Sequence, residues 1–126
     1  MIIGLGIDQI EIARIADAWR RFGERFRRRV YTRAEWEYCL SRHDPAASLA
    51  ARFAAKEAAM KALGLGWPGG IKYVDIEVTR ELTGRPGLQF SGTAQRRARQ
   101  VGVVRTSLSL THDRTRAAAT VIAERD

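Results

Sequence analysis

Three ionisable side chains in two separate segments are of the types that phosphate chemistry requires. Asp8 directly follows the apolar run 2–7, and Glu57 and Lys61 lie four residues apart, so that they share one face of a helix. In proteins Mg²⁺ takes one or two carboxylates and fills its remaining positions with water and substrate phosphate oxygens. Asp8 and Glu57 could therefore hold Mg²⁺, and Lys61 could place a positive charge against the same phosphate.

Each of these residues also has an ordinary structural explanation. Asp8 could cap a following helix, and Glu57 and Lys61 could form a solvated pair worth roughly 0.2–0.5 kcal/mol. The surrounding segment argues against this explanation, because residues 50–66 are mostly small, carry few but paired charges and end in a glycine-rich loop. Small residues allow a ligand or another chain to approach the helix backbone closely, which favours a binding site.

A second group of polar side chains lies near the C-terminus. Ser109 and Thr111 alternate with Leu108 and Leu110, so the two hydroxyl groups share one face of a predicted strand and could line a polar cleft. His112 follows at the end of that strand. Taken alone, such a histidine is more often structural or exposed to solvent, so these residues only suggest a ligand site.

Hydrophobic periodicity and turn residues predict the elements that position these side chains. The run 2–7 is typical of a buried strand whose glycines permit close packing, and Thr32 with Glu35 has the form of a helix-opening capping box. The predicted elements are strands over 2–7, 71–79, 88–90, 103–111 and 117–123, and helices over 12–22, 32–40, 46–63 and 92–101.

The order of these elements predicts the fold class. The last two strands are separated by 112–116, a loop of hairpin length, so antiparallel pairing is the simplest connection. Helices and antiparallel strands mix without a regular βαβ alternation, which indicates an α+β fold. A chain of 126 residues is one domain's worth of protein, and we expect a single domain over residues 1–126.

The net charge and the arginine content limit the classes of binding partner. The chain has 22 Lys and Arg against 14 Asp and Glu, a net charge of +8. Only Lys56, Lys61 and Lys72 are lysines, so the excess is almost entirely arginine, whose planar donor fork suits phosphate and carboxylate groups. An acidic partner is expected, and nucleic acid, a phosphorylated small molecule and an acidic protein all remain open at this point.

The same composition bears on the compartment. Cys39 is the single cysteine, so the chain can form no internal disulfide and no multi-cysteine metal site. Its apolar stretches are far shorter than the roughly 20 residues that cross a bilayer, and residues 1–8 lack the basic flank of a signal peptide. We therefore expect a cytoplasmic protein that does not contact membranes.

Taken together, the motifs resemble the holo-[acyl-carrier-protein] synthase family, the small bacterial 4′-phosphopantetheinyl transferases. The resemblance rests, in chain order, on Gly6-Ile7-Asp8 with Arg14, on Arg52-Phe53-Ala54-Ala55-Lys56-Glu57-Ala58 with Lys61, Gly64 and Gly66, on Gly84-Arg85-Pro86, and on Ser109-Leu110-Thr111-His112 with 117–119. The first two motifs are highly specific in combination, whereas the others alone would be weak.

The resemblance implies a reaction, an assembly and a set of site residues. The reaction transfers the phosphopantetheine arm of coenzyme A to a serine of apo-acyl carrier protein in fatty-acid or polyketide biosynthesis, requires Mg²⁺ and releases adenosine 3′,5′-bisphosphate. The fold is an antiparallel sheet packed against a long central helix, assembled as a homotrimer with active sites between subunits.

Transferred to this sequence, the family pattern assigns roles to three groups of residues. Asp8 and Glu57 would hold the metal and would be catalytic together with Lys61, with Glu57 or a metal-bound water as the base. Arg14, Arg21 and Phe22 would bind the carrier protein. The residues that would contact coenzyme A are Arg52, Phe53, Lys61, Gly64, Pro86, Ser109 and His112.

Some features remain outside this assignment. Arg42 is a candidate for the 3′-phosphate of the nucleotide, Trp67 could pack along the pantetheine path or in a subunit contact, and the arginines within 25–33 exceed what catalysis requires. The alternative function is a small basic nucleic-acid-binding domain. It is disfavoured because the chain has no recognisable binding motif and because Trp19 and Trp36 have the spacing of core residues.

Overall fold

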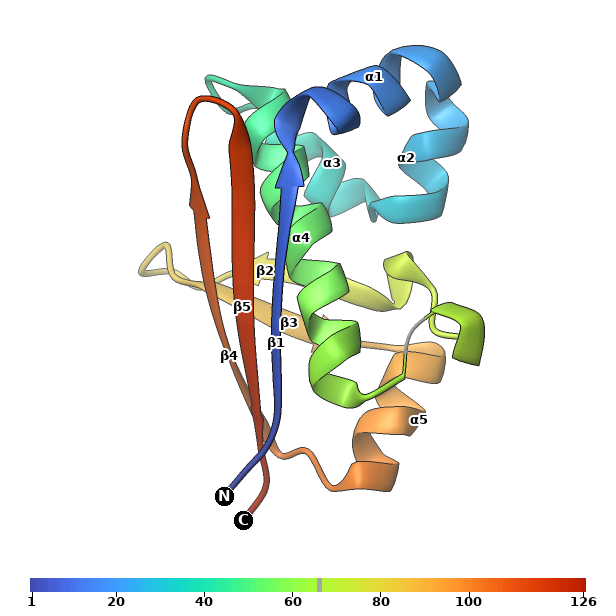
Figure 1. Ribbon diagram of the computed structural model, residues 1–126, viewed down its shortest axis with the longest axis vertical. Coiled ribbons are helices and arrows are strands. Elements are labelled where there is room, and N and C mark those ends of the chain that lie inside the picture. The colour runs from blue at the N-terminus through green and yellow to red at the C-terminus, as the bar shows by residue number, and fades with distance from the viewer. Residues whose placement is uncertain (66) are drawn as a thin grey trace.

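A long helix lies against one face of a three-stranded antiparallel sheet in this computed structural model (Figure 1), which describes residues 1–65 and 67–126 and, for Trp67, the backbone alone. The sheet has the order β1-β5-β4, with β1 at Ile2–Glu11, β5 at Arg116–Glu124 and β4 at Arg105–His112. The helix is α4 (Pro45–Leu63). The α+β class, the antiparallel hairpin and the packing of sheet on helix are confirmed, whereas the question of the Trp67 contacts lies outside the described residues.

The small residues of α4 bring its backbone unusually close to β1. Ala54, Ala55, Ala58 and Ala59 are fully buried. On the strand side, a Cβ added at Gly6 would collide with the Ala58 carbonyl oxygen, and one at Gly4 would collide with that of Ala62. The close approach therefore depends on glycine in β1 and on small side chains in α4, and it places the second half of β1 beside the charged face of α4.

The ends of α4 are determined locally. The Asp44 side chain accepts a hydrogen bond from the Ala47 backbone at 3.2 Å, and Pro45 occupies the first turn, where its missing N–H costs nothing. Gly64 ends the helix in the left-handed region, with φ at 71°. The predicted helix over 46–63 is thus confirmed to within one residue.

Three short helices lie at one end of the molecule: α1 (Ile12–Phe22), α2 (Glu24–Val30) and α3 (Arg33–Leu40). The capping box at α3 is confirmed, since Glu35 N donates to Thr32 Oγ1 at 3.2 Å and Thr32 N donates to Glu35 Oε1 at 2.8 Å. Helix α2 was not expected, because its run of arginines has no apolar periodicity, although Glu24 pairs with Arg27 and Arg28 within it.

The segment predicted as a strand over 71–79 is only half a strand. A 3₁₀ turn, η2, occupies Tyr73–Asp75, and β2 runs over Ile76–Arg80, paired with β3 (Pro86–Phe90) in a second, two-stranded sheet. A buried lysine, Lys56, lies at the junction of η2 and β2, where its ammonium group donates to the carbonyl oxygens of Tyr73 and Ile76 at 3.0 and 2.6 Å. Helix α5 (Gly92–Val101) follows as predicted, but without a hydrogen bond from the Ser91 side chain.

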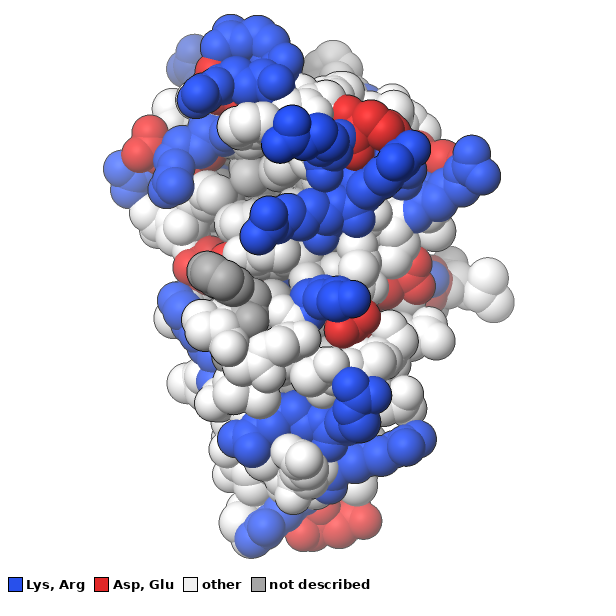
Figure 2. Space-filling model, turned by 90° about the vertical axis from the view of Figure 1, so that its right-hand side faces the viewer, with Lys and Arg blue, Asp and Glu red and all other residues white. Residues whose placement is uncertain are grey.

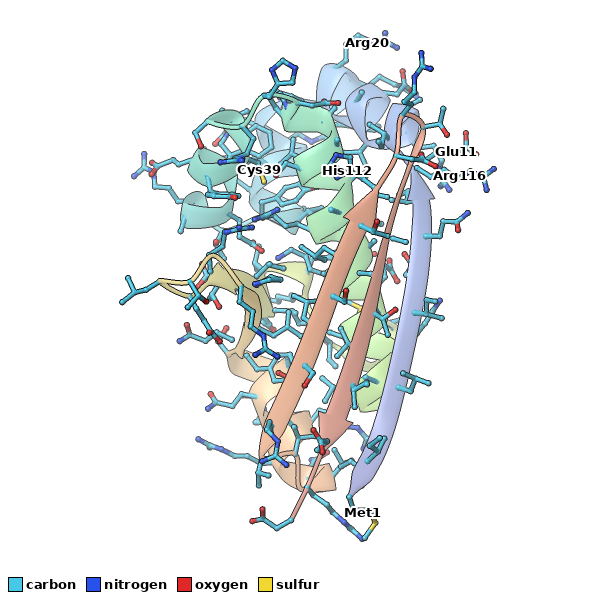
Figure 3. All side chains as sticks on the ribbon, turned by 90° about the vertical axis from the view of Figure 1, so that its left-hand side faces the viewer. Met1, Glu11, Arg20, Cys39, His112 and Arg116 are labelled. Carbon is cyan, nitrogen blue, oxygen red and sulfur yellow. The ribbon has the colours of Figure 1, made fainter. Side chains whose placement is uncertain are left out.

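No element of the described residues covers the face of the large sheet that is turned away from α4. Figure 3 views this face directly, with β4, β5 and β1 in front of the helices. Two aliphatic side chains of β1 on it, Leu5 and Ile7, are 63% and 64% exposed, and they lie opposite Ile122 and Thr120 of β5. Within the described residues, no helix is both long and apolar enough to span a membrane.

Candidate active site

The structure brings together the three residues that opened the sequence analysis. Asp8 lies on β1, and Glu57 and Lys61 lie on the face of α4 that packs beside it. The Lys61 ammonium group is 3.3 Å from Asp8 Oδ1 and donates to the Ile7 carbonyl oxygen at 2.8 Å. Asp8 and Glu57 both line a cavity of about 480 Å³, whereas Lys61 is not part of its wall and is linked to it through Asp8. Because β1 continues to Glu11, Asp8 lies within the strand and does not cap α1.

Glu57 is held by a residue that the sequence analysis did not identify. The Tyr73 hydroxyl donates to Glu57 Oε1 at 2.7 Å, and the Tyr73 ring stacks on Phe53 with centroids 5.3 Å apart. Burial, followed by the hydrogen bond to Glu57, raises the pKa of Tyr73 well above its usual value. No spacing rule could have found this contact, because it joins η2 to α4 across 16 positions.

The donor set of this cavity suits Mg²⁺. No group of three or more His, Cys, Asp and Glu side chains that could hold a metal occurs among the described residues. Two carboxylates on one cavity are nevertheless what Mg²⁺ requires when substrate phosphate and water complete its shell. Lys61 contacts only Oδ1 of Asp8, and Tyr73 contacts only Oε1 of Glu57, so each carboxylate has a second oxygen that no described side chain contacts.

The far wall of this cavity is formed by α1 and α2. Arg14, assigned to the carrier protein by the resemblance, lines it together with Phe26. Arg21 and Phe22 lie farther along α1, outside the cavity wall, where the guanidinium groups of Arg21 and Arg25 stand 5.3 and 5.9 Å from the Phe22 ring centroid. Figure 2 shows basic side chains gathered over this end of the molecule.

A second cavity, of about 320 Å³, lies between the N-terminal half of α4, α3 and the end of β4. Arg52 and His112, both assigned to coenzyme A, line it together with Arg42, the candidate for the 3′-phosphate. His112 points from the end of β4 toward the helices (Figure 3). The structure therefore places these three predicted residues around one space.

Tyr38 organises the positive charge of this second cavity. The guanidinium carbons of Arg52, Arg80 and Arg42 lie 4.5, 5.0 and 5.4 Å from the centroid of its ring. Cation–π contacts hold each arginine, but three like charges on one ring repel one another, so the arrangement is suited to an anion. Tyr38 and Arg80 were missed in the sequence analysis, because Arg80 reaches the ring from the distant strand β2.

Arg52 gives the strongest sign of a ligand in the second cavity. Its side chain is only 3% exposed, and Nη1 donates to Ser48 Oγ at 3.1 Å. Nε and Nη2 are buried, and no described residue accepts a hydrogen bond from either. A buried donor without a partner costs about 1–3 kcal/mol, so Arg52 brings an incompletely satisfied positive group to the wall of this cavity.

Other residues of the predicted set are not brought to these cavities within one chain. Ser109 and Thr111 do share a face, as predicted, but it is the bare outer face of the sheet, where Ser109 lies opposite Thr120. His112, three positions after Ser109, points to the other side because strand side chains alternate. Pro86 begins β3 and Gly64 ends α4, and neither lines the two cavities, whereas Phe53 lines the first cavity and not the second.

Lys56, the other lysine of the Arg-Phe-Ala-Ala-Lys-Glu-Ala motif, has a structural position. It is fully buried, and its ammonium group pairs with Glu35 Oε1 at 2.8 Å. Burial lowers the pKa of Lys56, while the charge of Glu35 opposes that shift. Lys56 therefore ties α4 to α3 and η2 and supplies no charge to either cavity.

Comparison with known proteins identifies the family of the chain. Residues 4–121 match the model of the 4′-phosphopantetheinyl transferase superfamily. The chain is 50% identical to the holo-[acyl-carrier-protein] synthase of Koribacter versatilis (strain Ellin345), covering 98% of this chain and 99% of that one.

Solved structures give the same result. The holo-[acyl-carrier-protein] synthase of Neisseria meningitidis has a TM-score of 0.89 and 32% identity, with 99% of this chain and 100% of that one covered. The Helicobacter pylori enzyme in complex with coenzyme A has a TM-score of 0.84 and 29% identity, with 95% and 99% covered. The resemblance inferred from the motifs is confirmed, and the chain belongs to the 4′-phosphopantetheinyl transferase superfamily.

Proposed function

We propose that this chain is a cytoplasmic holo-[acyl-carrier-protein] synthase, with residues 1–126 as a single domain. It transfers the 4′-phosphopantetheine arm of coenzyme A to a serine of an apo-acyl carrier protein in fatty-acid biosynthesis and releases adenosine 3′,5′-bisphosphate. The observation that carries this proposal is that Asp8 and Glu57 line one cavity and that Lys61 contacts Asp8. Full-length similarity to enzymes of that name supports it.

The first cavity receives the diphosphate of coenzyme A in this proposal. The serine nucleophile attacks a group that already carries negative charge, so positive charge must be held in place before the reaction. Lys61, fixed by Asp8 and by the Ile7 carbonyl oxygen, supplies part of that charge. Asp8 and Glu57 would hold Mg²⁺, which would withdraw further charge from the diphosphate when bound.

The second cavity receives the phosphate at the nucleotide end. Arg42, Arg52 and Arg80 present their donors around Tyr38, and His112 closes the site from β4. An anion with more than one charge would satisfy the buried Arg52 donors and relieve the repulsion among the three arginines. The 3′-phosphate of coenzyme A has this chemistry.

The positions of the two cavities support a site shared between subunits. One cavity is lined by β1 and the other by β4, which are opposite edges of the sheet. A threefold assembly through the bare sheet face would bury Leu5, Ile7 and Ile122 and bring the β4 edge of one copy to the β1 edge of the next. Ser109, on the same face, would then reach a neighbour's coenzyme A.

The carrier protein would dock on α1 and α2. Arg14 lies at the cavity wall, and Arg21 and Arg25 flank the 47% exposed ring of Phe22. This exposed aromatic residue between arginines suits an acidic, amphipathic helix that presents its serine to the cavity.

A direct transfer assay tests the proposal. Purified protein is mixed with apo-acyl carrier protein, coenzyme A and Mg²⁺, and the intact mass of the carrier is followed. We expect the carrier to gain one phosphopantetheine group. An unchanged carrier mass, together with salt-sensitive binding of the protein to DNA or RNA, would instead support the nucleic-acid alternative.

A further inference from the structure

Two contacts restrain Tyr73 in addition to the hydrogen bond of its hydroxyl group, one at its backbone and one at its ring. Its carbonyl oxygen accepts a hydrogen bond from the buried Lys56 ammonium at 3.0 Å, and that ammonium is itself paired with Glu35. Its ring stacks on Phe53 with an interplanar angle of 27°. These two contacts leave the side chain little freedom, so the direction of its hydroxyl group is determined by the fold.

The hydroxyl group is directed at one oxygen of Glu57. Tyr73 Oη donates to Glu57 Oε1 at 2.7 Å, and no other described side chain donates to that carboxylate. Lys61, which lies one helical turn from Glu57 and would be its ordinary ion-pair partner, pairs with Asp8. Glu57 therefore has its orientation set by a neutral donor, and its negative charge is not neutralised.

A neutral donor is the appropriate partner for a carboxylate that must bind a cation. A hydroxyl group limits the rotation of the carboxylate, adds no positive charge beside the cation and leaves the second oxygen available. Hydrogen bonds of this kind orient metal ligands in many proteins, and their loss typically costs about 10- to 100-fold in metal affinity or activity. A tyrosine hydroxyl group is protonated at neutral pH and can therefore act as the donor.

We propose that Tyr73 is a positioning residue that holds the Glu57 carboxylate in the orientation in which Glu57 and Asp8 together bind a divalent cation. This inference rests on the proposed function of the same cavity. It concerns a residue that lines the cavity and acts on the cation through Glu57, and it predicts an effect on cation affinity that stacking on Phe53 alone would not produce.

The test compares the intact protein with Tyr73→Phe, which keeps the ring and the backbone contact and removes only the hydroxyl group. Dissociation constants for Mg²⁺ are measured by calorimetry with coenzyme A present, and for Mn²⁺ by electron paramagnetic resonance. We expect both to weaken by about 10- to 100-fold. In the transfer assay the Mg²⁺ concentration for half-maximal rate should rise by a similar factor, while kcat at saturating Mg²⁺ recovers toward the wild-type value.

Tyr31→Phe is the matched control. Tyr31, like Tyr73, has a hydrogen-bonded hydroxyl group, which donates to the Leu49 carbonyl oxygen at 2.8 Å, and Tyr31 is the more deeply buried of the two. Loss of the Tyr31 hydroxyl group should lower the midpoint of thermal unfolding and leave the cation affinity unchanged. Circular dichroism and coenzyme A binding without added metal establish that Tyr73→Phe is folded.

The possible outcomes distinguish failure of the role proposed for Tyr73 from failure of the proposed metal site. Equal cation affinity in wild type and Tyr73→Phe would overturn the role of Tyr73 while leaving the metal site intact. A weakening of equal size in Tyr31→Phe would do the same, because the effect would then be general destabilisation. A wild-type protein that binds neither cation and transfers without Mg²⁺ would overturn the metal site itself.

Discussion

The ammonium group of Lys61 lies 3.3 Å from the Asp8 carboxylate, although 53 positions separate the two residues. The contact exists because β1 crosses α4 where glycine faces alanine, so that the backbones meet closely and the charged side chains beyond the crossing are brought together. The packing of glycine against alanine at this crossing therefore determines where Asp8 and Lys61 lie.

This dependence predicts the effect of Gly6→Ala. The added methyl group would collide with the Ala58 carbonyl oxygen and push β1 away from α4. We expect a loss of about 1–3 kcal/mol in the free energy of unfolding, measured with urea, and a fall in transfer rate as Asp8 leaves Lys61. A Gly6→Ala variant with wild-type stability and rate would show that the close approach is not needed.

The buried pair between Glu35 and Lys56 predicts a purely structural effect. Lys56→Met removes one partner and leaves the other charge buried, so the free energy of unfolding should fall by about 3–5 kcal/mol. The control is Arg33→Met, which breaks the exposed pair with Glu37 and should change stability by about 0.5 kcal/mol or less. Similar losses in both variants would argue against a specific role for the buried pair.

We expect the substitution Arg52→Met to change the preference for coenzyme A over dephospho-coenzyme A without lowering the stability of the ligand-free protein. Arg52→Met removes buried donors that have no partner within the described chain, so the ligand-free protein should be at least as stable as wild type. The KM for coenzyme A should rise by about 10- to 100-fold, the equivalent of one or two charge-assisted hydrogen bonds. Discrimination against dephospho-coenzyme A, which lacks the 3′-phosphate, should nearly disappear.

Two further variants check the assignment of the second cavity. Arg80→Met should behave like Arg52→Met, because both guanidinium groups lie over Tyr38. Arg96→Met, on α5 and outside the cavity, should keep wild-type discrimination. Full discrimination in Arg52→Met would place the 3′-phosphate elsewhere.

We expect a charge reversal on the basic surface of α1 to weaken the binding of the carrier protein and to leave the binding of coenzyme A unchanged. Arg21→Glu should raise the KM for the carrier and weaken the salt dependence of the reaction, with kcat and the KM for coenzyme A close to wild type. Arg99→Glu, on α5, makes the same charge change on a different surface and serves as the control. Equal effects of the two variants would mean that the carrier responds only to net charge.

The shared site predicts complementation between inactive variants. Glu57→Gln damages the first cavity and Arg52→Met the second, so mixed trimers would contain some sites in which both halves are intact. Co-refolded mixtures should therefore regain activity at low coenzyme A, and sedimentation should show a trimer. Mixtures no more active than the sum of their components would indicate that each chain carries a complete site.

Residues whose partners lie on the same element could be predicted from the sequence, whereas contacts across the fold could not. The spacing of Glu57 and Lys61 on a small-residue helix and the glycines before Asp8 pointed to the first cavity. Tyr73 and Arg80 belong to segments whose alternation suggests only strand. Their roles depend on Lys56 capturing the backbone of η2 and on Tyr38 facing β2, which are tertiary contacts without a local signature.

The same reasoning explains the errors in secondary structure. Alternating residues over 71–79 satisfy a strand pattern, but the carbonyl oxygen of Tyr73 accepts a hydrogen bond from the buried Lys56 ammonium group and its segment forms η2. The arginine run before Val30 has adequate helix propensity and no apolar stripe, so periodicity could not reveal α2.

The transfer assay on Glu57→Gln tests the central claim most directly. The substitution removes the charge of one carboxylate and keeps its size, and Glu37→Gln makes the same change on the exposed face of α3. We expect the carrier to gain phosphopantetheine mass with wild type and Glu37→Gln and to gain none with Glu57→Gln, although all three proteins share one circular dichroism spectrum. Wild-type turnover in Glu57→Gln would contradict the assignment of the site at the crossing of β1 and α4.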